Sequence, residues 1–266
     1  MSKIRYLAVT SHDPDALAAF YMKYLGMSEL GRNADGDVSL TDGGFNLTLM
    51  RLREGLHEPR LEPGFHHLGI AVDSIEEIKE RYLRFNPSGV IVPESGDLQH
   101  GEVRIHDPEA NPISLSERNF GVADSEPGIP RIAHIALNAL NTRVVFDFYS
   151  QVFGFRELTR AHAARQVEAD YRNLHVGDGD TNVAIQVFYN EEEGFHPRFG
   201  IAHMGFLVND SKVLADAVKE VGSIIPRPAS RQQSEVRIRD PQGNGCDLSQ
   251  RGWEVDTDKW VSAQVA

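Results

Sequence analysis

The chain repeats its own sequence pattern, and this repetition restricts the folds it can adopt more than any other feature. The stretch GEVRIHDPEANPISLS, which begins at Gly101, matches SEVRIRDPQGNGCDLS, which begins at Ser234, at a constant separation of 133 residues. In the same way FHHLGIAVDS matches AHMGFLVNDS, which places His67 on His203. A duplication of this extent predicts two halves with the same architecture.

A smaller unit is repeated within each half. The first unit contains IRYLAVTSHDPDALAAFYMKYLGM, where strand-like alternation gives way to helical spacing that starts after Asp13 and stops at Gly26. The third unit, IAHIALNALNTRVVFDFYSQVFGF, follows the same plan, and further helices are expected at about 74–85 and 210–221. We therefore expect an α+β protein with mixed sheets, built from four strand–helix–strand–strand–strand (βαβββ) units of about 60 residues each.

This organisation predicts two domains, an N-terminal one at 1–118 and a C-terminal one at 131–250. The stretch between them, NFGVADSEPGIP at 119–130, is rich in glycine, proline and polar residues and has no periodicity, so it is expected to be a linker. Residues 251–266 form a tail. We expect its two tryptophans, Trp253 and Trp260, to dock on the body of the protein.

Composition narrows the class of protein. The net charge of −12 argues against a nucleic-acid partner, because phosphate binding needs clustered cations. No apolar run is long enough for a membrane span or a signal peptide, and the single cysteine, Cys246, excludes an internal disulfide. These features predict a cytoplasmic protein with no membrane partner. A homo-oligomer is compatible with the sequence, although no surface pattern establishes one.

Two histidines and one carboxylate stand on predicted strands of the second half. They are His134 in IAHIALNAL, His203 in AHMGFLVND and Asp247 in GNGCDLS. Two imidazoles and a carboxylate can occupy one face of an octahedral ion, which suits Fe(II) and also Mn(II) or Zn(II). The alternative is that each histidine is a core residue with a satisfied hydrogen bond. Cys246 is expected on the opposite face from Asp247, buried as a small hydrophobic residue.

The four βαβββ units, the DPxGN turn before the last strand and the histidines on first strands together resemble the vicinal oxygen chelate superfamily. That superfamily includes glyoxalases, extradiol dioxygenases and bleomycin-resistance proteins. The resemblance implies cup-shaped sheets whose metal ligands come from the first and last strands of the units. Carried over to this sequence, it implies His134, Gln186, His203 and Asp247 as ligands, with hydrogen bonding to substrate as the other use of Gln186. The corresponding first-half positions, where no metal is expected, are Tyr6, Met50, His67 and Ser114.

The resemblance implies that the chain is a metal-dependent enzyme that acts on a small molecule with vicinal oxygens. The favoured hypothesis is an Fe(II) extradiol-type dioxygenase of a catecholic or hydroquinone-like ring, with Mn(II), Zn(II) or Ni(II) as other metals. One alternative is a glyoxalase- or epimerase-like lyase or isomerase, motivated by the fourth position, Gln186. The other is a non-catalytic binding protein similar to the bleomycin-resistance members.

The sequence departs from the extradiol pattern around the last ligand. Arg237 stands where that pattern has a tyrosine, Asp247 stands for a glutamate, and the second-sphere histidine falls near Thr181 or Asn182. Arg237 is therefore a candidate catalytic residue that could bind an anionic substrate or support an oxyanion, with a structural ion pair as the alternative. His175, just before a GDGD turn, is the second candidate, since it could reach the mouth of the cup.

Overall fold

The computed structural model describes residues 1–52, 62–95, 100–123, 128–158, 173–187, 200–226 and 234–253. The N-terminal half consists of β1 (Lys3–Ser11), α1 (Pro14–Leu25), β2 (Ser28–Arg32), β3 (Val38–Thr41), β4 (Asn46–Arg51), β5 (Gly64–Ala71), α2 (Ile75–Phe85), β6 (Val92–Pro93), β7 (Val103–His106), β8 (Pro112–Ser116) and the 3-10 turn η1 (Asn119–Gly121). The C-terminal half consists of β9 (Arg131–Asn138), α3 (Thr142–Phe153), β10 (Arg156–Glu157), β11 (Asn173–Gly177), β12 (Asn182–Gln186), β13 (Gly200–Leu207), α4 (Ser211–Val218), β14 (Ser223–Pro226), β15 (Val236–Arg239) and β16 (Gly245–Ser249).

Each half forms one mixed eight-stranded sheet. The orders are β2-β3-β4-β1-β5-β8-β7-β6 and β10-β11-β12-β9-β13-β16-β15-β14, which are equivalent strand for strand. The first strands of the two units, β1 and β5 or β9 and β13, are antiparallel neighbours at the centre. Each also pairs in parallel with the last strand of its own unit. The expected α+β fold of four βαβββ units is confirmed, and neither sheet closes into a barrel over its described strands.

Local chemistry explains where α1 begins and ends. The Asp13 carboxylate accepts a hydrogen bond from the backbone N–H of Ala16, and Pro14 occupies the first helical turn, where its missing N–H costs nothing. Gly26 ends the helix with φ of 66°, a left-handed conformation that glycine adopts without steric strain. These bounds agree with the sequence pattern. Helix α4, in contrast, ends at Val218 rather than near 221, because a tight turn carries the chain back to the sheet edge there.

The two sheets and the helices enclose one continuous hydrophobic core that draws on both halves. A second, smaller apolar cluster lies on the opposite, concave face of the N-terminal sheet, which we call the N-terminal cup. It consists of Tyr6, Ala8, Ala71 and Phe120, with Met50 packed against it. The concave face of the C-terminal sheet is called the C-terminal cup below. Polar and charged side chains, rather than apolar ones, occupy much of it.

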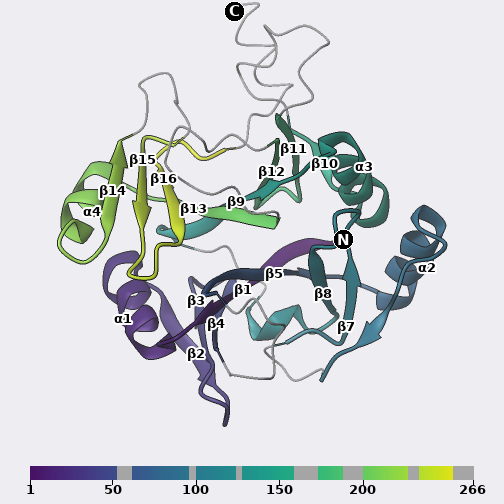
Figure 1. Ribbon diagram of the computed structural model, residues 1–266, viewed down its shortest axis with the longest axis horizontal. Coiled ribbons are helices and arrows are strands. Elements are labelled where there is room, and N and C mark those ends of the chain that lie inside the picture. The colour runs from purple at the N-terminus through teal and green to yellow at the C-terminus, as the bar shows by residue number, and fades with distance from the viewer. Residues whose placement is uncertain are drawn as a thin grey trace, which may run out of the picture.

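Helices from different halves lie side by side. Figure 1 shows α1 next to α4 at one end of the molecule and α2 next to α3 at the other. At the first end the Tyr21 hydroxyl of α1 donates a hydrogen bond to the Asp240 carboxylate, which follows β15, at 2.7 Å. At the second end Phe148 of α3 packs edge-on against Tyr82 and Phe85 of α2. The halves are therefore joined both by apolar packing and by a buried hydrogen bond.

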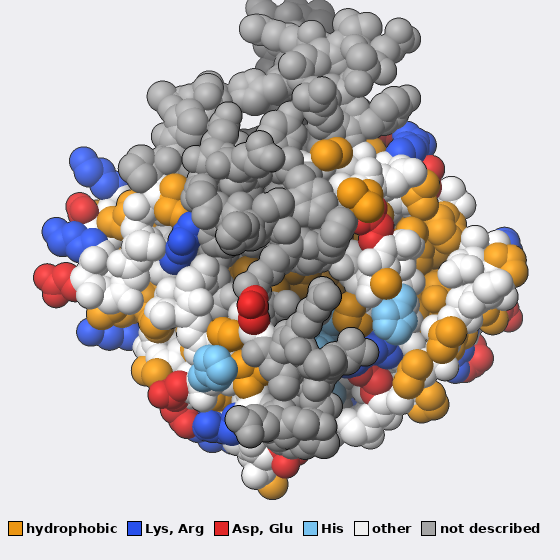
Figure 2. All heavy atoms as spheres, in the orientation of Figure 1, with side chains coloured by type: hydrophobic (Ala, Val, Ile, Leu, Met, Phe, Trp, Pro, Cys, Tyr) orange, Lys and Arg blue, Asp and Glu red, His pale blue; other side chains and the backbone are white. Residues whose placement is uncertain are grey.

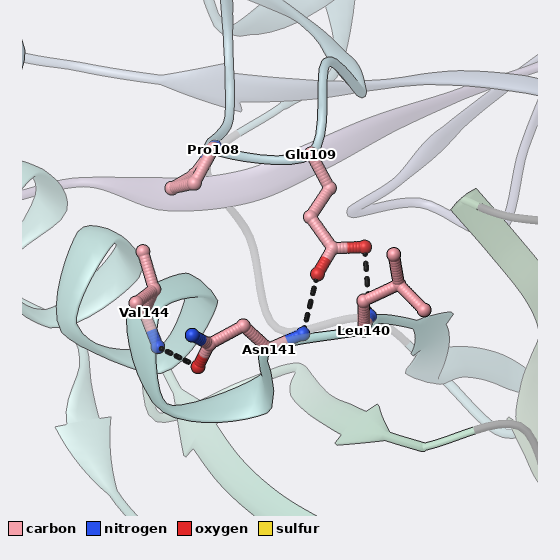
Figure 3. Close-up of a pocket in the computed structure, with 5 residues that line it drawn as sticks. All are labelled: Pro108, Glu109, Leu140, Asn141 and Val144. Carbon is pink, nitrogen blue, oxygen red and sulfur yellow. Dashed lines mark hydrogen bonds between the residues drawn. The ribbon is translucent and has the colours of Figure 1, made fainter.

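A pocket of about 500 Å³ also lies between the halves. Figure 3 shows Glu109 reaching from the N-terminal half to the chain just before α3. Its two carboxylate oxygens accept the backbone N–H groups of Leu140 and Asn141, at 2.9 and 2.7 Å. Asn141 in turn accepts the N–H of Val144 at 3.2 Å. These contacts already satisfy three backbone donors at the start of α3, so we assign the pocket to the interface between the halves rather than to a candidate site.

The Tyr21 hydrogen bond gives a first prediction. Tyr21→Phe should lower the free energy of unfolding by about 1.5–3 kcal/mol, because it removes one of the charge-assisted hydrogen bonds that satisfy the buried Asp240 carboxylate. The matched control is Tyr149→Phe in α3, since the buried Tyr149 hydroxyl has no hydrogen-bond partner among the described residues. That variant should be neutral or slightly stabilising. Urea unfolding of both variants checks the difference, and equal effects would contradict it.

The surface shows no single charged patch in the view of Figure 2, where acidic and basic side chains are interspersed around the edge of the molecule. In the described part of the chain, none of the helices combines the length and apolar character that crossing a membrane requires.

Candidate functional site

One row of side chains crosses the C-terminal sheet on its cup face. His134 lies opposite Asn182 on one side and opposite Gly205 on the other. Gly205 lies opposite Asp247, which lies opposite Arg237. Because residues that lie opposite each other on paired strands point to the same face, this register brings the row together in the cup. His203 joins from the neighbouring rung, opposite Ala136.

The three predicted metal ligands lie close together. The ring centres of His134 and His203 are 5.3 Å apart, and His203 Nε2 is 3.4 Å from the Asp247 carboxylate. All three side chains are buried. The convergence arises from three strands, β9, β13 and β16, so it depends on the sheet register rather than on local sequence.

Arg237 also belongs to this cluster, and it engages the carboxylate at both oxygens. Its Nε donates to one oxygen of Asp247 at 2.5 Å and its Nη2 donates to the other at 3.1 Å. The same Nη2 lies 3.2 Å from His203 Nε2. Burial alone would raise the pKa of Asp247, but His203 and Arg237 outweigh burial and hold it well below its usual range. Asp247 is therefore an anion paired with a buried guanidinium.

As arranged, this donor set does not fit a metal ion. The carboxylate that would be the third ligand is bound in a bidentate ion pair, and a divalent cation placed there would lie next to the guanidinium. Across the described residues, no group of three or more histidine, cysteine, aspartate or glutamate side chains is spaced to hold a metal. The predicted ligands His134, His203 and Asp247 are thus neighbours, but the carboxylate of Asp247 is already bound by Arg237.

Gln186 does not lie beside the other three. It stands four residues beyond Asn182 on β12, about 13 Å along the strand, and donates to Asn138 Oδ1 at 3.1 Å. Asn182 lies opposite His134 instead. Cys246 is buried on the helix-facing side and belongs to the main core, away from the cup face of Asp247.

Asn182 orients two histidines. Its side-chain oxygen lies 2.7 Å from His134 Nδ1 and 3.1 Å from His175 Nδ1. Burial, followed by the nearby His203, keeps the pKa of His134 well below its usual range, so its imidazole is neutral at pH 7. With Nδ1–H donated to Asn182, His134 Nε2 is left as a hydrogen-bond acceptor. His175 is buried in the cup beside Asn182 rather than exposed at its mouth.

Trp253 covers this cluster. Its indole stacks on the His134 ring with a centroid distance of 4.7 Å and an interplanar angle of 8°. A Cβ on Gly205 would lie only 2.7 Å from the indole, so the close approach requires glycine at this position. The expected docking of Trp253 agrees with its exposure of 4%. The other tryptophan, Trp260, lies outside the described residues.

The position of Trp253 follows from the repeat in the sequence. Phe120 lies 133 residues before it, the same separation that relates the two halves. Phe120 stacks on Tyr6 at 4.8 Å in the N-terminal cup, at the position equivalent to Trp253 on His134. Each cup is therefore filled by an aromatic residue that follows its last strand. Extending the alignment past Ser249 would have indicated the surface on which Trp253 docks.

The buried histidines predict how stability depends on pH. Burial, with smaller effects of His66 and Arg104, holds the pKa of His67 well below its usual range. In the unfolded chain the same group titrates near pH 6.5. Below that pH the unfolded state binds a proton that the folded state excludes. The free energy of unfolding should therefore decrease as the pH is lowered, by up to about 1.4 kcal/mol per pH unit for each such group.

Urea unfolding of wild type and His67→Asn between pH 7.5 and 5.5 measures this effect. The variant should show a shallower loss of stability than wild type. The exposed His12→Gln is the matched control and should keep the wild-type dependence. Identical pH profiles for wild type and His67→Asn would contradict a neutral, buried His67.

Comparison with known proteins places these observations in context. The family model described as Glyoxalase/Bleomycin resistance protein/Dioxygenase superfamily matches residues 3–115 and 131–248. No curated protein sequence matches the chain. Among solved structures, the Mn(II)-bound glyoxalase from Novosphingobium aromaticivorans is similar at a TM-score of 0.71 and 17% identity, over 97% of this chain and 86% of that one.

Two dioxygenases are also similar in structure. The 2,3-dioxygenase LapB from Pseudomonas sp. KL28 has a TM-score of 0.69 at 16% identity, over 96% of this chain and 94% of that one. The 2,2',3-trihydroxybiphenyl 1,2-dioxygenase from Sphingomonas wittichii strain RW1 has a TM-score of 0.64 at 14% identity, over 97% and 94%. At such identities the likeness is one of fold.

Proposed function

Since the chain belongs to the Glyoxalase/Bleomycin resistance protein/Dioxygenase superfamily, we propose that its C-terminal cup binds a planar, oxygen-bearing aromatic molecule without a metal ion. The observation that carries this proposal is the ion pair between Arg237 and Asp247. Because that carboxylate is bound to Arg237, only His134 and His203 are left to coordinate a metal ion. Two imidazoles are fewer than the three protein ligands of an ordinary catalytic metal site.

The indole of Trp253 indicates what kind of molecule the cup accepts. It lies flat on the His134 ring and fills the space above Gly205. Stacking of this kind favours any planar ring, because it depends on apolar area and on the distribution of charge over the ring. An aromatic ligand of similar size would take the same place when the indole moves away.

Trp253 also lacks one anchor that its counterpart has. In the N-terminal cup, the Asn46 amide donates to the backbone oxygen of Phe120 at 2.9 Å. The equivalent amide nitrogen, that of Asn182, has no hydrogen-bond partner among the described residues. Phe120 is therefore held through its backbone in a way that Trp253 is not, which supports displacement of Trp253 by a ligand.

The polar side chains supply recognition of oxygen atoms. His134 Nε2 accepts a hydrogen bond from a ligand hydroxyl, and the guanidinium of Arg237 is a donor for a second oxygen. These two groups lie in the same row, on either side of Gly205 and Asp247, so a ring that bears more than one oxygen is the kind of molecule that can reach both. A catechol-like ring is the simplest molecule with that pattern.

Tryptophan fluorescence tests the proposal directly. The chain has two tryptophans, so a Trp260→Phe variant reports on Trp253 alone. Titration with catechol or naphthalene-2,3-diol should shift its emission to longer wavelength in a saturable way, because the indole moves into water, and EDTA should not prevent the shift. Cyclohexane-1,2-diol, which has the oxygens without the planar ring, is the control. No response to any aromatic diol would refute the proposal.

An Fe(II) extradiol-type dioxygenase is the second candidate. The adjacency of His134, His203 and Asp247 favours it, and several similar structures are dioxygenases. Anaerobic reconstitution with Fe(II) or Mn(II), followed by oxygen uptake with a catechol panel, separates the two candidates. One tightly held metal ion per chain with oxygen uptake would establish the dioxygenase. The lyase or isomerase alternative is motivated by Gln186, which lies away from the cluster, so the adjacency of the other three residues does not favour it over the dioxygenase.

A further inference from the structure

We propose that the N-terminal cup is a second binding site, which takes a small neutral molecule with adjacent hydroxyl groups. This site is independent of the proposed function of the C-terminal cup. It is built on an equivalent row of residues: Tyr6 lies opposite Gly69, Gly69 opposite Ser114, and Ser114 opposite Arg104. The register places Tyr6, Ser114 and Arg104 on one face of the sheet.

Four buried polar atoms of this cup have no hydrogen-bond partner among the described residues. They are Tyr6 Oη, Ser114 Oγ, Arg104 Nε and Glu94 Oε2. Tyr6 and Ser114 are both fully buried, with an exposure of 0%. Burial raises the Tyr6 pKa, and the nearby Thr48 hydroxyl, which bonds to Ser39 and Asn46, opposes this only in part. Leaving a buried polar group unsatisfied is costly, so four in one place require a partner.

The four atoms belong to side chains that lie close together. Glu94 forms an ion pair with Arg104 through its other carboxylate oxygen. Glu94 and Ser114 both lie against Gly101. A Cβ atom added to Gly101 would be 2.4 Å from Glu94 Oε2 and 2.6 Å from Ser114 Cβ, so these two side chains are close to each other. Tyr6 and Ser114 stand on either side of Gly69 in the row. Phe120 stacks on Tyr6 and covers Gly69, so it forms an apolar wall of the site.

The charges and donors of the site define the class of ligand. Arg104 and Glu94 neutralise each other, and burial keeps the adjacent His67 neutral by lowering its pKa, so the site has no excess charge. Arg104 Nε only donates, Glu94 Oε2 only accepts, and the two hydroxyls do both. A molecule with neighbouring hydroxyl groups can satisfy all four. Arg104 and Glu94 retain side-chain exposures of 29% and 14%, which leaves this side of the cup accessible to solvent.

Ligand-observed NMR with the full chain tests the site, with ethylene glycol and glycerol as probes, since neither has the planar ring proposed for the C-terminal cup. At least one probe should bind saturably. Tyr6→Phe and Ser114→Ala each remove one orphaned hydroxyl, and each should weaken that probe about fivefold or more. Tyr149→Phe also removes a buried hydroxyl without a described partner, but one outside the cup, and should leave affinity unchanged. Trp253→Phe should leave it unchanged as well, which separates this site from the C-terminal one.

The unliganded variants provide an independent measurement. Because Tyr6→Phe and Ser114→Ala delete atoms that lack partners, their melting temperatures should equal or exceed that of wild type. Binding of no probe would mean that ordered water alone fills the cup, and it would overturn the proposal. The proposal would equally fail if both variants bound the probe as tightly as wild type, or if both melted several degrees lower without ligand.

Discussion

Replacing Arg237 with alanine should lower the free energy of unfolding by about 3–5 kcal/mol, the largest effect that we expect of any charged residue described by the structure. The reason is the environment of Asp247. Its carboxylate is buried, and Arg237 donates to both of its oxygens. Without the guanidinium, the anion stays in a poorly solvated site with only His203 beside it, and its pKa should rise. Urea unfolding at pH 7 measures the loss.

Two further variants separate the charge effect from packing. Arg104→Ala in the N-terminal cup is the matched control, because Arg104 is more exposed and its partner Glu94 retains contact with solvent. It should cost about 1 kcal/mol or less. The double variant Arg237→Met/Asp247→Leu removes both charges and should recover most of the stability lost in Arg237→Ala. Equal losses in the single and double variants would contradict the unpaired Asp247 carboxylate as the cause of the lost stability.

The same substitution should change metal binding. In wild type the Asp247 carboxylate is held by Arg237, so added Zn(II) or Ni(II) should leave the melting temperature unchanged. In Arg237→Ala the carboxylate is released next to His203 and His134, which gives two imidazoles and one carboxylate together. Added metal should then raise the melting temperature of the variant. Stoichiometric metal in wild type would instead favour the dioxygenase.

Trp253→Ala should be the most costly substitution of an apolar residue near the site, at about 3–5 kcal/mol. The indole is buried, stacks on His134 and fills the space above Gly205, so its removal leaves a cavity that neighbouring side chains cannot fill without moving. Circular dichroism during urea unfolding measures the loss. A change below about 1 kcal/mol would mean that the indole does not pack in the cup.

Added indole should partly restore this variant. A cavity that has the shape of a missing aromatic side chain binds the free ring, and binding to the folded state raises the melting temperature. Phe120→Ala is the control, since it opens the equivalent cavity in the other cup, where Asn46 anchors the backbone. Indole should stabilise Trp253→Ala more than Phe120→Ala, and wild type least.

Much of the fold could be predicted from the sequence because it is encoded locally. Asp13 with Pro14 marks the start of α1 and Gly26 its end, and both act through contacts within a few residues. The repeat at 133 residues added the relation between the halves. The end of α4 could not be placed in this way, since the turn after Val218 is set by the position of the sheet edge to which the chain returns.

The candidate site was predictable in part. His134, His203 and Asp247 were expected to converge because first and last strands of such units are neighbours, and the structure brings them together. Gln186 was expected beside them, but the register of β12 against β9 places Asn182 opposite His134 instead. A shift of four residues along a strand does not alter the alternation of faces, so the sequence pattern could not distinguish these two residues.

The sequence by itself determined the number of units, their order of strands and helices, and the faces on which the histidines and the carboxylate stand, since all of these follow from short-range periodicity and repetition. Only the tertiary structure decided that Arg237 pairs with Asp247 and that Trp253 covers His134. Both contacts join separate segments of chain. They depend on strand register and on the volume left above Gly205, which are properties of the assembled sheet and not of any single segment.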